Sequence, residues 1–124
     1  MALVNQIKLG ISMELWDIVR FQISFHCYLN KISISDQNLD CLTLLAIAGE
    51  IELGEFCDKS AENKIFKNSQ SARTSLQALE EKNLIVTSKI AKAKKRIKLS
   101  DKLVVHTQGN IFMNIKLLRV EAPQ

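Results

Sequence analysis

Residues 68–85 read NSQSARTSLQALEEKNLI, and residues 86–100 read VTSKIAKAKKRIKLS. The first run spaces its apolar side chains three and four residues apart, as on one face of an amphipathic helix. The second run predicts a hairpin, with short strands at residues 85–87 and 96–99 around a loop that is crowded with lysine and contains neither Gly nor Pro.

The two ends of the predicted helix carry recognisable signals. Asn68 or Ser69 can cap its first turn, because a short polar side chain accepts a hydrogen bond from a free backbone N–H. Asn83 stands where a left-handed residue commonly ends a helix, and Leu84 follows it as the apolar contact. The face that we expect to be buried consists of Ala72, Leu76 and Leu79.

Similar signals precede this segment. A helix is predicted to begin at Ser35 or Asp36 and to end at Gly49, with Leu39, Leu42, Leu45 and Ala46 on its buried side. Residues 50–53 read as a short extended link, and residues 54–61 as a short helix.

Both ends of the chain favour strands. From residue 19 to 29 apolar and polar residues alternate, residues 7–15 do the same, and this two-residue period predicts half-buried strands. A helix through Ile18, Phe21, Phe25 and Leu29 is the competing interpretation. Towards the C-terminus, residues 103–105 and 111–120 read as strands with a turn at 108–110. The sequence therefore predicts an α+β fold.

Length and composition favour one domain over residues 1–124, with N-terminal strands in 1–33, a central unit in 34–100 and C-terminal strands in 101–122. Charge is divided unevenly. Residues 1–63 contain four basic and nine acidic residues, a net charge of −5, whereas residues 64–119 contain thirteen basic and three acidic residues, a net charge of +10. Such a division suits either a polyanion at the basic end or packing against a second copy.

The order helix, short strand, helix, helix, hairpin from Ser35 to Leu99 resembles a winged-helix domain. The segment from Ala72 to Ile85 is similar to the corresponding helix ending in MarR-like regulators and plasmid replication initiators. Lys98-Leu99-Ser100-Asp101 through Gly109-Asn110 resembles the strands that follow the wing in plasmid replication proteins. The sequence as a whole loosely resembles those of small proteins of crAss-like tailed bacteriophages.

The resemblance implies a winged helix-turn-helix core that binds double-stranded DNA, with the second helix of the pair in the major groove and the wing on the backbone. On this chain the implied DNA-binding residues are Ser69, Gln70, Arg73, Thr74 and Gln77 on the helix and Lys89, Lys92, Lys94, Lys95, Arg96 and Lys98 on the wing. The carboxylates between residues 50 and 62 would repel DNA unless they point away from it. We expect a regulator or replication accessory in the bacterial cytoplasm, with no enzymatic activity, no cofactor and no membrane partner.

Other functions remain open. The long alternating segments and the uneven charge also suit a homo-oligomer or a virion protein, such as a ring or connector component of a phage head–tail junction. A metal site is not expected, because His26, Cys27, Cys41 and Cys57 lack the close pairs typical of zinc ligands. Buried thiols are the simpler interpretation of the cysteines.

Overall fold

The computed structural model describes residues 14–91 and 94–107, and these form an α+β protein with four helices and a three-stranded antiparallel sheet. The helices are α1 (Leu15–Leu29), α2 (Asp36–Ala48), α3 (Leu53–Glu62) and α4 (Ser69–Glu81). The strands are β1 (Ile51–Glu52), β2 (Ile85–Ala91) and β3 (Lys94–Leu99), and they lie in the order β1-β3-β2.

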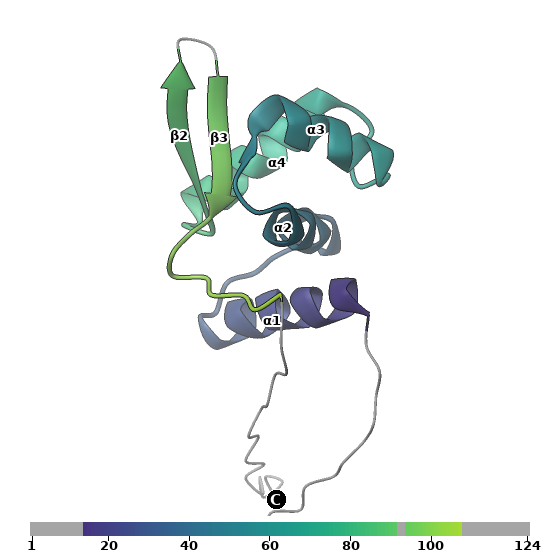
Figure 1. Ribbon diagram of the computed structural model, residues 1–124. Helices are drawn as coiled ribbons and strands as arrows, with labels where there is room; N and C mark the ends of the chain where they lie inside the picture. Colours follow the sequence, from purple (N-terminus) through teal and green to yellow (C-terminus); the bar gives the residue numbers. More distant parts are fainter. Residues whose placement is uncertain (1–13, 92–93, 108–124) are drawn as a thin grey trace, which may run out of the picture.

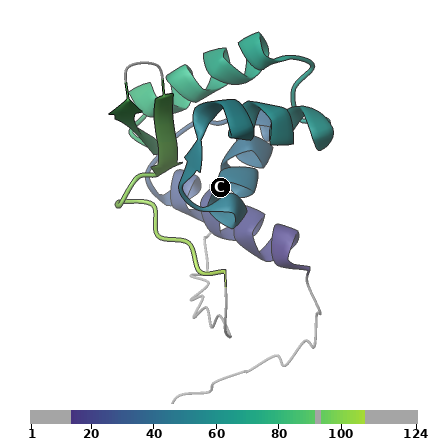
Figure 2. The ribbon, with the colours of Figure 1, turned by 45° about the horizontal axis from the view of Figure 1, so that its top comes forward.

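The elements stack in layers with α2 in the middle (Figure 1). Helix α1 packs on one side of α2, while α3, α4 and the sheet lie on the other side. The β2–β3 hairpin projects beyond the helices at the end of the molecule farthest from α1. Figure 2, which turns the top of the molecule forward, shows α4 crossing behind the hairpin and α1 still on the opposite side.

One apolar core joins these layers. Every helix and every strand contributes buried side chains to it. Leu103, which follows the last strand, is only 3% exposed and also belongs to the core. Helix α2 buries Cys41, Thr43 and Leu44 in addition to the predicted Leu39, Leu42 and Leu45, because it has neighbours on both sides. Ala46 is half-buried. The hydroxyl of Thr43 donates to the Leu39 carbonyl at 2.8 Å, so this buried polar group is satisfied.

The order of elements predicted between residues 35 and 99 is confirmed, and so are its local signals. The Ser35 hydroxyl accepts from the Asn38 N–H at 3.2 Å, and the Asn68 side chain accepts from the Ser71 N–H at 2.8 Å. Asn83 has a φ of 61°, and Gly49, after the end of α2, has a φ of 76°. These capping interactions fix where α2 and α4 begin, while the apolar side chains Ala72, Leu76 and Leu79 decide which face of α4 is buried.

The strand predicted from residue 19 to 29 is wrong, because the chain forms helix α1 there. Val19, Ile23 and Cys27 are its buried side chains, four residues apart. The apolar residues Phe21, Phe25 and Leu29 lie on another face and are exposed. Because α1 is apolar on two faces, every odd-numbered position from 19 to 29 is apolar, and this imitates the two-residue period of a strand. Residues 7–13 of the other predicted strand lie outside the described residues.

The strand predicted at residues 103–105 is also wrong. After β3 the chain runs without strand pairing through residues 101–107 and lies against α1. The Gln22 side chain holds it there: its amide nitrogen donates to the His106 carbonyl at 2.8 Å, and its oxygen accepts from the His106 N–H at 2.8 Å. The Gln22 side chain thus pairs with the backbone groups of His106 that a neighbouring strand would otherwise pair with. The predicted turn at 108–110 and strand at 111–120 lie outside the described residues.

The hairpin strands are longer than predicted. The lysine-rich region that we expected to be a loop is largely strand, with Ser88 opposite Arg96 and Lys89 opposite Lys95. The register shifts between Lys89 and Ala91, where the ladder has an irregularity. Charged side chains permit this extension because both faces of the hairpin are exposed beyond the core, while the backbone pairing continues as far as Ala91 and Lys94.

Candidate nucleic-acid interface

The predicted helix residues share one exposed face of α4. Ser69, Gln70, Arg73, Thr74 and Gln77 are all exposed, and the opposite face buries Ala72, Leu76 and Leu79. The Asn68 cap fixes the start of α4 at Ser69, so this polar face covers the first nine residues of the helix. The Thr74 hydroxyl donates to the Gln70 backbone carbonyl within the helix at 2.9 Å. The long side chains of Gln70, Arg73 and Gln77 form no hydrogen bond within the described residues.

The predicted wing residues fall into two sets, one on each face of the hairpin. Side chains alternate along a strand, so Lys95 shares the face of buried Ile97, and its cross-strand neighbour Lys89 lies on that face too. The other face carries Lys94, Arg96 and Lys98. Lys92 lies outside the described residues.

A groove runs between α4 and the inner face of the hairpin. It has a volume of about 550 Å³, and the predicted residues Arg73, Gln77 and Lys95 line it together. Leu76 and Ile97 belong to its lining as well as to the core. The remaining lining residues, which the sequence interpretation missed, are Leu53, Glu80, Glu81 and Thr87.

The groove is basic at one end and acidic at the other. Arg73 comes from the first half of α4, while Glu80 and Glu81 occupy its last turn. Glu80 is engaged within the protein, because its carboxylate accepts a hydrogen bond from the Thr87 hydroxyl at 2.6 Å. This contact ties the C-terminal end of α4 to β2.

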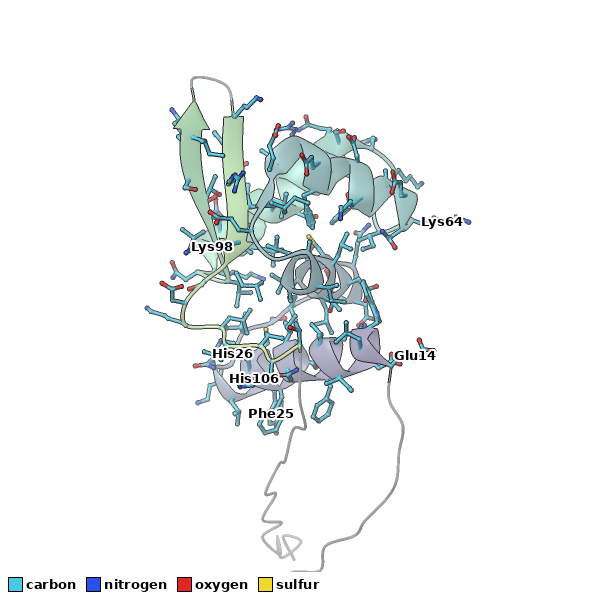
Figure 3. All side chains as sticks on the ribbon, viewed as in Figure 1. Glu14, Phe25, His26, Lys64, Lys98 and His106 are labelled. Atoms are coloured by element: carbon cyan, nitrogen blue, oxygen red, sulfur yellow. The ribbon has the colours of Figure 1, made fainter. Side chains whose placement is uncertain are left out.

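Two of the three cations on the outer face of the hairpin have acidic neighbours. Arg96 lies opposite Glu52 in the β1–β3 register, and the Lys98 amino group lies 4.0 Å from the Asp101 carboxylate. Figure 3 shows Lys98 near the base of the hairpin, away from its tip. On the inner face, by contrast, Lys89 and Lys95 face each other, and like charges opposite one another repel. A bound anion should therefore stabilise the inner pair, Lys89 and Lys95, more than the outer cations.

The carboxylates of α3 stay out of the groove. Glu55, Asp58 and Glu62 are exposed, while the buried face of the helix carries Phe56, Cys57 and Ser60. None of these three carboxylates lines the groove. The three exposed carboxylates of α3 therefore lie outside the groove that Arg73 and Lys95 line.

The three cysteines are buried free thiols, as the sequence predicted. Burial raises the pKa of Cys27 and of Cys57, and raises the pKa of Cys41 to about 12. Such thiols stay protonated at neutral pH and are poor nucleophiles. Within residues 14–91 and 94–107, no three His, Cys, Asp or Glu side chains are grouped so that they could hold a metal ion.

The Cys41 pKa predicts a loss of stability in alkali. The unfolded thiol ionises near pH 9.0 but the folded thiol only near pH 12, so the stabilisation is full below pH 9 and is lost as the pH rises. The loss approaches about 1.4 kcal/mol per pH unit. Urea unfolding from pH 8 to 10.5 should show a steeper decline for the native chain than for Cys41→Ala. Parallel profiles would contradict this assignment.

No helix in the described part of the chain combines the length and the apolar character needed to cross a membrane. Comparisons of the chain with protein-family models, with curated proteins and with solved structures gave no match.

Proposed function

We propose that this protein is a non-enzymatic winged-helix module that binds double-stranded DNA, acting as a phage or plasmid type of regulator or replication accessory in a bacterial host cell. The observation that carries the proposal is the groove in which Arg73 and Gln77 of α4 meet Lys95 of β3. These residues come from the two elements that contact DNA in winged-helix proteins, the second helix of the pair and the wing.

The chemistry of the groove fits a duplex. Arginine and glutamine side chains can form paired hydrogen bonds with guanine and adenine edges in the major groove. Lys89 and Lys95 provide adjacent positive charges one strand apart, which suits phosphates along a backbone. A phosphate bound between the two lysines would also remove their mutual repulsion. Binding of DNA should therefore stabilise the hairpin.

Binding should depend strongly on salt. Each phosphate neutralised by Lys or Arg releases counterions, so contacts to four to six phosphates give a slope of about −3.5 to −5.5 in log affinity against log salt. Fluorescence anisotropy with a labelled duplex of about two helical turns, from low to physiological salt, measures this slope. A slope near zero would exclude backbone binding through these cations.

A second function is supported by the exposed apolar face of α1, on the opposite side of the molecule from the hairpin. A subunit with two separate contact surfaces can join a larger assembly, such as a ring or connector of a phage head–tail junction in the virion. Size-exclusion chromatography with light scattering distinguishes the two functions. A monomer or dimer favours the DNA-binding module, and a large closed ring favours the virion component.

A further inference from the structure

Helix α1 exposes a set of large apolar side chains that nothing in the described structure covers. Phe21 is 45% exposed and Phe25 37%, and their rings stack on each other with centroids 6.2 Å apart. Figure 3 shows Phe25 projecting from the side of α1 that faces away from the rest of the protein. Tyr28 and Leu29 extend the patch by one turn, with exposures of 79% and 61%. Clusters of this kind on a protein surface mark interaction sites.

The other face of α1 is already used. Val19, Ile23 and Cys27 pack against α2 and are at most 2% exposed. A helix that is apolar on opposite faces is typical of one that is covered on both sides. The stacked Phe21–Phe25 pair should therefore have a partner surface of the same aromatic and aliphatic character.

The pattern along α1 is self-complementary. The two phenylalanines lie near the middle of the helix. Glu14, before its first residue, is seven residues ahead of Phe21, and Lys31, after its last turn, is six residues beyond Phe25. If a second α1 packs antiparallel across a two-fold axis, each Phe21 meets the other copy's Phe25, and each Glu14 approaches the other copy's Lys31. Both charged side chains are exposed, and neither takes part in an ion pair within the described residues.

We propose that the exposed face of α1 is a dimer interface, in which two copies of this chain pair their α1 helices antiparallel around the Phe21–Phe25 stack. Apolar burial at the centre and opposite charges at the rim are the usual anatomy of such an interface. An antiparallel pair also sets the positive end of each helix dipole beside the negative end of the other.

This arrangement has a consequence for DNA binding, and that consequence rests on the proposed function. Because α1 and the hairpin lie at opposite ends of each copy, the dimer carries its two basic grooves at its two far ends (Figure 1). Such a dimer would bridge two separate DNA segments rather than read two neighbouring half-sites on one face of a duplex, which needs recognition helices about one helical turn apart.

The central test is the oligomeric state of the full chain. Light scattering across a dilution series should show twice the 14.0 kDa chain mass at high concentration and a shift towards monomer on dilution. Phe25→Glu should weaken the dimer by about tenfold to hundredfold, because it places a charge in the apolar centre. Ile47→Glu is the matched control: it places the same charge on an apolar side chain of similar exposure, 38%, in α2 and outside the patch, and should leave the dimer intact.

A charge exchange tests the antiparallel orientation. Glu14→Lys and Lys31→Glu should each weaken the dimer, and the double variant should restore it, because each rim pair then has opposite charges again. Circular dichroism and urea unfolding establish that every variant is folded. A chain that stays monomeric at all concentrations, a closed ring, or a dimer insensitive to Phe25→Glu would each overturn the proposal. None of these results depends on DNA binding, so this interface and the proposed function can fail separately.

Discussion

Replacing Ile97 by Ala should lower the free energy of unfolding by about 2–5 kcal/mol. Ile97 is 1% exposed and lies in β3, the central strand, between Ile51 of β1 and Thr87 of β2. Its side chain completes the contact of the sheet with α2 and α3, so its removal leaves a cavity where three layers meet. Since domains of this size are stable by only about 5–15 kcal/mol, the loss would be a large fraction of the total. Urea unfolding followed by circular dichroism measures it.

The hairpin offers a matched control for this substitution. Ile90 is the same residue type in β2, but it is 55% exposed, so Ile90→Ala should change the free energy of unfolding by no more than about 0.5 kcal/mol. The comparison separates burial from strand propensity, because both changes replace a β-branched residue by Ala within one hairpin. Equal losses for the two variants would mean that Ile97 contributes through propensity and not through packing.

Ile97 also connects the core to the groove. It fixes the inner face of β3, and Lys95, two residues earlier, shares that face because strand side chains alternate. The same buried side chain that stabilises the sheet therefore decides which lysine points towards Arg73. Binding by Ile97→Ala should be measured only where the variant is fully folded.

The central part of the fold could be predicted because its signals are local. The Ser35 and Asn68 caps and the left-handed Asn83 each depend on a few neighbouring residues, and the structure confirms all three. A side chain within three residues supplies the missing hydrogen-bond partner, so no distant contact is needed to read it. The order of elements from residue 35 to 99 follows from these local signals.

Helix α1 could not be predicted in the same way, because periodicity reports which residues are apolar and not which become buried. Even the helical alternative chose the face of Phe21 and Phe25, whereas the structure buries Val19 and Ile23. The packing of α2 against Val19 and Ile23 decides which of the two faces is buried. The misleading alternation and the candidate dimer face have one cause, since both arise from apolar residues on two sides of α1.

The basic residues of the candidate site were predicted as a group, but their division between the two hairpin faces was not. The signal was present: Ile97 and Leu99 alternate with Arg96 and Lys98, which separates Lys95 from the other cations of its strand. That Arg73 and Lys95 line the same groove could not be predicted from the sequence, because only the tertiary structure brings α4 next to β3.

This division predicts different effects for two double variants that remove the same charge. Lys89→Gln with Lys95→Gln neutralises the inner face, next to Arg73, and should lower DNA affinity by about tenfold or more at low salt while reducing the salt slope by about 1.8. Arg96→Gln with Lys98→Gln removes two of the three outer-face cations, the two that have Glu52 and Asp101 as neighbours, and should have a clearly smaller effect. Because net charge falls equally in both, any difference reports position.

Stability should change in the opposite direction to affinity for the inner pair. Lys89 and Lys95 face each other across the ladder, so removing their repulsion should leave the free energy of unfolding unchanged or raise it by a few tenths of a kcal/mol. Weaker binding by an equally stable protein would then be a direct effect of the lost cations and not of a damaged hairpin. If the outer pair costs as much affinity as the inner pair, the protein reads only total charge, and the groove beside Arg73 has no special role in DNA binding.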